Sequence, residues 1–203
     1  MRIITISREF GSGGRELGKR LADELGFDYF DREIVTMIAQ SSQLDEHYVE
    51  QNLENHSWNI PITYGTSFSH VPYQTFAPQN TIISEQQKII KQLAAKGDCV
   101  IVGRNADVIL ADLNPLKIFV YADMDSKLAR CKSRATEGEN LTDKQMVRKI
   151  KSIDKGRARN HALISDIKWG SRQGYDLMVN TADKTIKNLV PAVAEYAKAY
   201  FGK

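Results

Sequence analysis

The chain has 203 residues and a formal net charge of +3, and 42% of its residues are hydrophobic. This length and apolar content predict one globular domain with a proper core and exclude a disordered chain. The charge is too small to indicate a nucleic-acid binder, and no apolar run approaches the roughly 18 residues needed to span a bilayer. Without a signal-peptide pattern or metal-spaced cysteines, we expect a cytoplasmic protein with reduced Cys99 and Cys131.

The first elements are an apolar strand over residues 3–6, a glycine-rich turn at 11–14 and a helix from about residue 15. Glycines let consecutive backbone N–H groups point at an anion, and the helix start adds its positive dipole end. The cations Arg15, Lys19 and Arg20 crowd that helix start, where a bound polyanion would relieve their unfavourable position. The alternative is a tight strand-to-helix turn that binds nothing.

Helices and apolar strands then alternate along the chain. Helices are predicted at 32–40, 45–55, 81–96, 126–135, 144–161 and 184–201, and strands near 27–31, 98–103, 116–121 and 175–180. This alternation predicts an α/β fold, a parallel sheet with helices on both faces. A ligand of such a sheet lies at the carboxyl ends of its strands, where residues 8–15, 103–107 and 122–123 should converge.

Residues 56–80 break the helical pattern, with three prolines interleaved with aromatic residues. A loop of that length inside a compact domain is typical of a functional lid or binding loop. Its aromatic side chains could stack on a base or simply anchor the loop to the body.

Several arginines are candidates for phosphate contacts. Arg104 follows a buried strand and a glycine, so its guanidinium could fork onto a phosphate, or else pair with a nearby aspartate. The stretch from 130 to 159 is rich in Lys and Arg, and most of these cations should form a solvated face. Four of them lie near chain reversals, where a closing lid could neutralise a phosphoryl group: Arg130, Arg134, Arg157 and Arg159.

Carboxylates that could serve Mg²⁺ are fewer. Glu16 occupies the position of the usual hydroxyl ligand in a phosphate-binding loop, and Asp107 and Asp123 follow predicted strands. Glu16 could instead be an ordinary first-turn acid that the helix dipole favours.

These segments carry a resemblance to a known family. The opening of the chain resembles the phosphate-binding loop (P-loop) of bacterial cytidylate kinases, T-I-D-G-P-S-G-A-G-K-G-T. The chain as a whole looks like the divergent cytidylate kinase-like family. The motifs that carry this resemblance are I-S-R-E-F-G-S-G-G-R-E-L-G at 6–18, F-D-R-E-I at 30–34, V-G-R-N-A-D at 102–107, D-K-G-R at 154–157, W-G at 169–170 and Y-D-L-M-V-N-T at 175–181.

The resemblance implies a single P-loop NTPase domain over 1–203, with a helical nucleoside-monophosphate-binding insertion at about 41–96 and a lid at about 130–162. It implies a kinase that moves the ATP γ-phosphate to a (d)CMP-like acceptor with Mg²⁺. The sites are then assigned as follows: phosphate-binding Gly11, Ser12, Gly13, Gly14, Arg15 and Glu16; catalytic Arg15, Arg104, Arg130 and Arg157; acceptor-binding Asp31, Arg32 and Arg104; metal-binding Glu16 and Asp107.

The chain departs from the family pattern of true cytidylate kinases at three places. In the general loop pattern G-x-x-x-x-G-K-[ST], Gly14 stands where the lysine belongs and Arg8 stands at the first glycine. Asn105 replaces the aspartate of a G-R-D motif. The segment 31–37 lacks the serine and arginine that help hold CMP, and Arg32 is the candidate to replace that arginine.

Three functional hypotheses follow. The first is a nucleotide-dependent phosphotransferase in which Arg15 supplies the charge of the missing lysine, since arginine can engage two phosphate oxygens. The second is a nucleotide-binding protein without catalysis, and the third is a small-molecule kinase with a non-CMP acceptor. In each case we expect nucleotides and small molecules as partners, with no nucleic acid and no membrane. The sequence does not indicate the oligomeric state.

Overall fold

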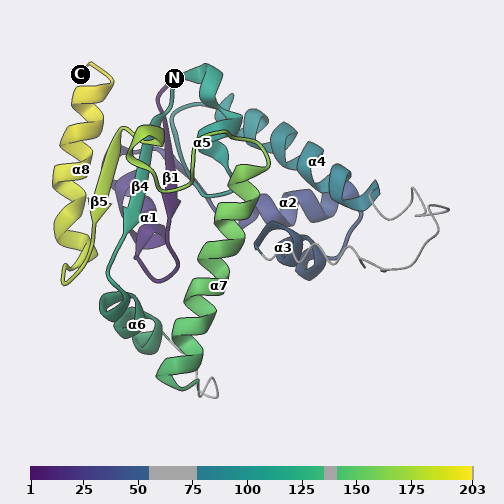
Figure 1. Cartoon of the computed structure of the whole chain (residues 1–203). Helices are drawn as coiled ribbons and strands as arrows, with labels where there is room; N and C mark the ends of the chain where they lie inside the picture. Colours follow the sequence, from purple (N-terminus) through teal and green to yellow (C-terminus); the bar gives the residue numbers. More distant parts are fainter. Residues whose placement is uncertain (55–76, 135–140, 203) are drawn as a thin grey trace.

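A computed structural model describes residues 1–54, 77–134 and 141–202 (Figure 1). Its described residues form a five-stranded, wholly parallel sheet in the order β2-β3-β1-β4-β5. The strands are β1 (Ile3–Arg8), β2 (Asp28–Phe30), β3 (Cys99–Val102), β4 (Leu116–Tyr121) and β5 (Leu177–Asn180). The predicted α/β fold with a parallel sheet is therefore confirmed.

Helices cover both faces of this sheet, as predicted. The longer ones are α1 (Gly14–Leu25), α2 (Glu33–Ser42), α3 (Glu46–Glu54), α4 (Ala77–Ala94), α6 (Met124–Ser133), α7 (Asp143–Ala162) and α8 (Ile186–Tyr200), and α5 (Ala106–Ile109) is a single turn. In Figure 1, α8 stands beside β5 at one end of the sheet, and α7 crosses from α6 towards α5. Among the described residues, no helix is long and apolar enough to cross a membrane.

The structure departs from the predicted elements at two places, the start of one helix and one additional turn of helix. Helix α4 begins at Ala77, inside the segment predicted as a loop, and residues 56–76 of that predicted loop lie outside the described residues. The turn α5 was not predicted, because four residues are too short for helical periodicity to register.

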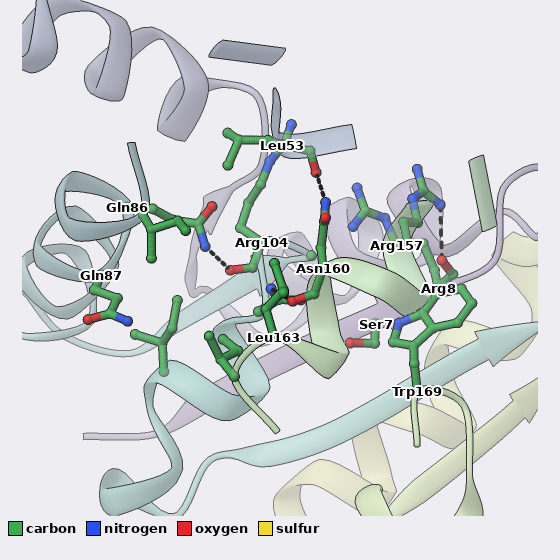
Figure 2. A pocket seen from close by; sticks show the side chains of 15 residues that line it. Ser7, Arg8, Leu53, Gln86, Gln87, Arg104, Arg157, Asn160, Leu163 and Trp169 are labelled. Atoms are coloured by element: carbon green, nitrogen blue, oxygen red, sulfur yellow. Dashed lines mark hydrogen bonds between the residues drawn. The ribbon is translucent and has the colours of Figure 1, made fainter. Parts of the chain in front are cut away.

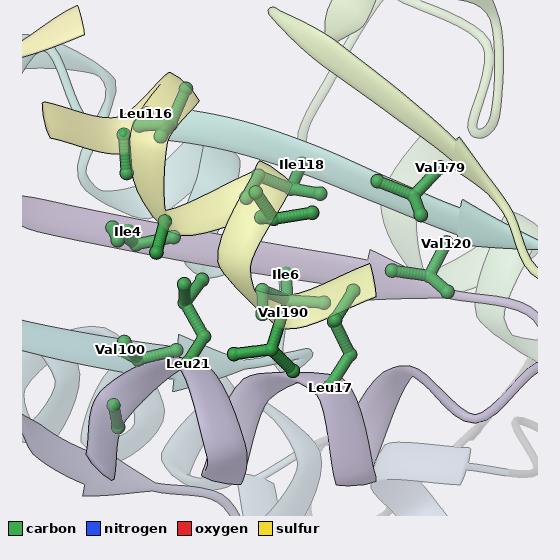
Figure 3. Packing of buried hydrophobic residues seen from close by; sticks show 14 of the residues in the cluster. Ile4, Ile6, Leu17, Leu21, Val100, Leu116, Ile118, Val120, Val179 and Val190 are labelled. Atoms are coloured by element: carbon green, nitrogen blue, oxygen red, sulfur yellow. The ribbon is translucent and has the colours of Figure 1, made fainter. Parts of the chain in front are cut away.

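Alternation along β1 divides the core between the two faces. Ile4 and Ile6 point to the face covered by α1 and α8, where they meet Leu17, Leu21 and Val190 (Figure 3). Successive side chains of a strand point to opposite faces. Ile3 accordingly packs on the other face, in a second cluster to which α2 and α4 contribute. A strand buried on both sides explains why the β1 sequence is a continuous apolar run.

This arrangement places the end of β1 in the middle of the molecule. β1 is the central strand, and its last residue, Arg8, lies opposite Val120 of β4. β3 ends at Val102, which pairs with Ile6, whereas β1 continues beyond Ile6. The chain then enters the glycine-rich turn before α1. The carboxyl ends of β1 and β3 thus adjoin, which is where parallel sheets hold their ligands.

Helix α1 lies unusually close to the sheet at Gly18, and this contact can be tested. A Cβ atom there would lie 2.7 Å from Val102 Cγ2 and 3.1 Å from Ile6 Cδ1. We expect Gly18→Val to lower the free energy of unfolding by roughly 2 kcal/mol, because overpacking displaces the helix. Urea denaturation measures this, with exposed Lys19→Val as the control for a β-branched residue on the same helix. Equal effects of the two substitutions would contradict the close packing.

Candidate functional site

The glycine-rich turn has the backbone geometry of an anion cradle. Gly11 and Gly13 both adopt left-handed conformations, with φ of 77° and 83°. Gly13 is the N-cap of α1, and no side chain of the described residues caps this helix. The first N–H groups of a helix have no acceptor within the helix, so an anion can accept their hydrogen bonds here. Space also demands glycine, since a Cβ on Gly13 would lie 2.6 Å from Ile186 Cδ1.

A partly buried ion cluster holds the entry to this turn from the side of α6 and α7. The backbone N–H of Phe10 donates to Asp154 Oδ1 at 2.6 Å. Lys127 Nζ donates to Asp154 Oδ2 at 2.9 Å and to Glu9 Oε2 at 3.1 Å. Burial alone would lower the pKa of Lys127, but its bonds to Asp154 and Glu9 outweigh burial and hold that pKa above its ordinary value.

The last residue of the D-K-G-R motif binds the end of β1, just before the turn. Arg157 Nη1 donates to the backbone carbonyl of Arg8 at 3.0 Å. Asp154 and Arg157, three residues apart on one side of α7, therefore contact the chain on either side of Glu9. The motif predicted as part of a lid fastens α7 to the glycine-rich turn in this structure.

A cavity that we call the loop cavity opens over the turn and is strongly cationic. Its described lining carries seven cationic side chains against two carboxylates, Glu9 and Glu50. Such an excess of positive charge favours a polyanion. The cations are Arg8, Arg15, Arg32, Arg130, Arg134, Lys149 and Arg157.

A second cavity, the strand-end cavity, lies at the carboxyl ends of β1 and β3 (Figure 2). Its described lining has three arginines, several amides and no acidic side chain. The polar part is Ser7, Arg8, Gln86, Gln87, Arg104, Asn105, Arg157 and Asn160, and the apolar part is Leu53, Ile83, Ile109, Leu163, Ile164 and Trp169, with Gly103 between β3 and Arg104. This combination suits a ligand with an anionic group and an apolar or aromatic body.

Arg8 and Arg157 line both cavities, so the two cavities meet at these residues. The Arg8 side chain is buried, with 8% of the residue exposed. Burial, followed by the charge of Arg157, lowers the pKa of Arg8 to about 9, although the Asp31 carboxylate 3.6 Å away opposes this shift. Positive charge is thus in excess of negative charge where the two cavities meet.

The residues after β3 form a strained turn that presents Arg104. Gly103, Arg104 and Asn105 all have left-handed φ, at 75°, 59° and 54°. A non-glycine residue in this region costs on the order of 1 to 3 kcal/mol and persists only where the surroundings hold it. Gln86 of α4 does so, because its Nε2 donates to the Arg104 carbonyl at 2.9 Å, as Figure 2 shows.

Asn160 of α7 ties three segments together beside the strand-end cavity. Its Nδ2 donates to the carbonyl of Leu53 in α3 at 2.7 Å, and its own carbonyl accepts from Asn105 Nδ2 at 3.2 Å. Helix α7 therefore links the glycine-rich turn, the strained turn and α3.

The W-G motif supplies the aromatic wall of the strand-end cavity. Trp169 packs edge-on against Phe119 of β4, with ring centroids 5.1 Å apart. Gly170 follows with a φ of 74°, and a Cβ there would lie 3.0 Å from Phe119 Cζ. The glycine thus allows the close approach that fixes the indole.

The three predicted acceptor residues do not share one cavity: Asp31 and Arg32 line an open hollow beside α1, and Arg32 also lines the loop cavity. Asp31 is buried and forms an ion pair with Arg15 Nε, besides its 3.6 Å contact with Arg8. Arg32 is exposed and lies 4.0 Å from Glu50. Neither Asp31 nor Arg32 lines the strand-end cavity, whereas the third predicted acceptor residue, Arg104, does.

Arg130 joins α6 to the chain after β5. It donates to Thr181 Oγ1 at 3.2 Å and to the backbone carbonyls of Thr181 and Lys184. Thr181 Oγ1 in turn donates to the carbonyl of Ser12 at 2.7 Å. Arg130 therefore supports the glycine-rich turn and also lines the loop cavity.

The structure separates the two predicted metal ligands. Glu16, in the first turn of α1, pairs with Arg20 at 2.9 Å and with Arg134. Asp107 is buried, with Oδ2 3.2 Å from His161 Nε2. Among the described residues, no three His, Cys, Asp or Glu side chains form a metal cluster. Mg²⁺ is often held by one carboxylate together with phosphates and water. Glu16 is in the first turn of the helix that starts at the cradle and is therefore the candidate for that role, although neither Glu16 nor Asp107 lines the loop cavity.

Sequence reasoning missed four residues of the site: Arg8, Gln86, Asn160 and Trp169. Arg8 had a signal, since a cation at the first glycine of the loop pattern is itself an anomaly. Asn160 follows Asp154 and Arg157 at helical spacing, so it could have been placed on the same side of α7. Trp169 was noted as part of the W-G motif, but without a role. Gln86 had no signal, because its contact is tertiary.

The family model that matches this chain is the cytidylate kinase-like family, over residues 3–183. The chain therefore belongs to the cytidylate kinase-like family. Sequence comparison finds no curated protein with significant similarity.

Solved structures show the same fold. A protein from Eubacterium ventriosum is 24% identical with a TM-score of 0.70, over 98% of this chain and 99% of that one. A shikimate kinase from Bacteroides thetaiotaomicron is 12% identical with a TM-score of 0.56, over 100% and 99%. A thymidylate kinase from Candida albicans is 14% identical with a TM-score of 0.51, over 98% and 92%. The fold is that of P-loop kinases, as predicted.

The Lys127 cluster has a pH dependence that can be measured. Because the folded state holds the pKa of Lys127 above its ordinary 10.5, this lysine stabilises the fold fully below that pH. Its contribution is lost as the pH rises through the folded-state pKa. We expect the loss of unfolding free energy in Lys127→Met to be constant near neutral pH and to shrink above a pH of 10.5. The exposed Lys132→Met on α6 is the control for removing a surface lysine; a constant difference for Lys127→Met at all pH values would contradict this account.

Proposed function

We propose that this protein is a nucleotide-dependent phosphotransferase that moves the γ-phosphate of ATP to a (d)CMP-like acceptor. The observation that carries this proposal is the meeting of two cavities, one over the glycine-rich turn and one at the strand ends, at Arg8 and Arg157. A phosphotransferase needs a donor site and an acceptor site that share one point, where the phosphoryl group passes.

The loop cavity supports a triphosphate donor. The N–H groups at the start of α1, with Gly13 as N-cap, provide a cradle for phosphate oxygens. Arg15, Arg130 and Arg157 stand around the cradle and can neutralise the charge of three phosphates.

The strand-end cavity supports an anionic, ring-bearing acceptor. Arg104 lines it beside Arg8 and Arg157, and these guanidinium groups suit a phosphate monoester. Trp169 offers an aromatic surface to a base, and the amides of Gln86 and Asn160 can both donate and accept hydrogen bonds.

Phosphoryl transfer requires positioning and charge neutralisation more than covalent chemistry. In this proposal Arg157 and Arg130 hold the transferred group in line between donor and acceptor. Mg²⁺, where it accompanies ATP, would neutralise phosphate charge, and Glu16 is the carboxylate that would hold it through water. A phosphate acceptor is already ionised at neutral pH, so no general base is needed.

The proposal is tested by ADP release from ATP with CMP and dCMP. We expect Arg104→Met to raise the KM for the acceptor by at least about tenfold, because a charge-assisted contact to phosphate is lost. The KM for ATP should change little, since Arg104 does not line the loop cavity. Arg148→Met, at an exposed position of α7 that lines neither cavity, is the matched control. Equal effects of Arg104→Met on both KM values would contradict the two-site assignment.

A second candidate function is a small-molecule kinase with a non-CMP acceptor. It is favoured by the apolar side of the strand-end cavity, where Leu53, Ile83 and Leu163 offer no partner for a polar ribose. The same assay with a panel of phosphorylated, carboxylated and hydroxylated acceptors separates the candidates. Nucleotide binding with no turnover on any acceptor would favour the non-catalytic hypothesis.

A further inference from the structure

We propose that Arg8 supplies the phosphate-neutralising charge that a lysine provides in the standard loop pattern. This inference rests on the proposed function, because it assumes a nucleotide phosphate over the glycine-rich turn. It assigns the role to a residue at the end of β1, six positions before the place where the lysine would stand.

The first argument is a reciprocal exchange between two positions. The pattern G-x-x-x-x-G-K has glycine first and lysine last. This chain has Arg8 at the first position and Gly14 at the last. In the structure, a Cβ atom on Gly14 would lie 2.5 Å from Arg8 Cβ and 2.9 Å from Arg8 Cγ. A lysine at position 14 and an arginine at position 8 therefore exclude each other. The two departures from the pattern thus have a single steric cause.

A third glycine makes room for the far end of the same side chain. A Cβ on Gly103 would lie only 1.6 Å from Arg8 Nη1. The Arg8 side chain thus runs from Gly14 at its base to Gly103 at its guanidinium, with a residue that lacks a side chain at each end. Gly103 belongs to the strained turn that presents Arg104, so the guanidinium lies against the strand-end cavity.

The second argument is electrostatic. Arg8 is buried, and the charges of Arg157, Arg104 and Arg15 all disfavour its own positive charge. Asp31 is the opposing carboxylate, but it lies 3.6 Å from Arg8 and is also paired with Arg15. A buried cation surrounded by other cations is unfavourable in the absence of an anion. A phosphate at the junction of the cavities would supply that anion.

The third argument concerns Arg15, the residue that the sequence predicts as the lysine substitute. Arg15 is 53% exposed in its side chain and engaged with Asp31. It lines the loop cavity but not the strand-end cavity, whereas Arg8 lines both. Only Arg8 of this pair reaches the point that donor and acceptor share.

The first experiment compares binding by calorimetry of Mg²⁺–ATP and of inorganic tripolyphosphate. The proteins are wild type, Arg8→Met, Arg8→Lys and Arg15→Met, with Arg148→Met as control, because Arg148 is exposed on α7 and lines neither cavity. We expect Arg8→Met to weaken both ligands by at least about tenfold, since a charge-assisted contact is lost. Arg8→Lys should retain part of the affinity, and Arg15→Met should have a smaller effect than Arg8→Met. The melting temperature of ligand-free Arg8→Met should not fall below that of wild type. The substitution removes a buried charge, and Asp31 remains in its ion pair with Arg15.

The second experiment tests the reciprocal exchange directly with Arg8→Gly, Gly14→Lys and the double variant. Gly14→Lys alone should lower the melting temperature, because its side chain collides with Arg8. In the Arg8→Gly background the same substitution should be tolerated, and the double variant should bind tripolyphosphate more tightly than Arg8→Gly. The relief of the collision tests the steric part, and the gain in tripolyphosphate binding would not arise if Arg8 were only a structural cation.

The outcomes separate this inference from the function on which it rests. If wild type binds neither ATP nor tripolyphosphate, the proposed function and the role of Arg8 both fail. If wild type binds but Arg8→Met binds equally well, the function stands and the role of Arg8 is overturned. A larger loss in Arg15→Met than in Arg8→Met would assign the charge to Arg15 instead. Additive effects of the two exchange substitutions on melting temperature would also overturn the reciprocal exchange.

Discussion

The burial of one guanidinium at the end of the central strand constrains the rest of the site. Arg8 fills the space beside the glycine-rich turn, so Gly14 cannot carry a side chain, and its far end requires glycine at position 103. A glycine there begins the left-handed turn that turns Arg104 towards the strand-end cavity. Asp31 lies 3.6 Å from the same guanidinium and also forms an ion pair with Arg15. Two separate sequence features, Gly14 and Gly103, thus follow from the placement of one side chain.

Sequence reasoning recovered the fold because its signals are local. The continuous apolar runs of β1, β3 and β4 predicted strands buried on both faces, and the helices between them predicted parallel pairing. The family resemblance then led to the P-loop kinase fold. The glycine-rich turn was also placed correctly before α1, since glycine in a strand-to-helix connection is a local requirement. The roles of Arg15 and Glu16 stay predictions.

The site was harder to predict because its contacts join residues far apart in the chain. The Phe10 N–H to Asp154 bond spans 144 residues, and nothing in either segment alone indicates it. Gln86 lies in a segment correctly predicted as a helix, but nothing in that segment indicates that its amide binds the Arg104 carbonyl. Asp107 looked like a metal ligand because it follows a strand, yet a single turn of helix carries it to His161. These are properties of packing, which periodicity does not encode.

The strand order has a consequence for how the chain folds as it is synthesised. β1 comes first in the sequence, but its two neighbours in the sheet are β3 and β4, whose first residues are Cys99 and Leu116. At about 5 to 20 residues per second, the ribosome needs several seconds to release a first partner for this isoleucine-rich strand. During that interval its unpaired edges and both apolar faces are open to other chains. A nascent chain of this topology therefore depends on early shielding by α1 or by a chaperone, and its folding rate is set by long-range strand pairing and not by its helices.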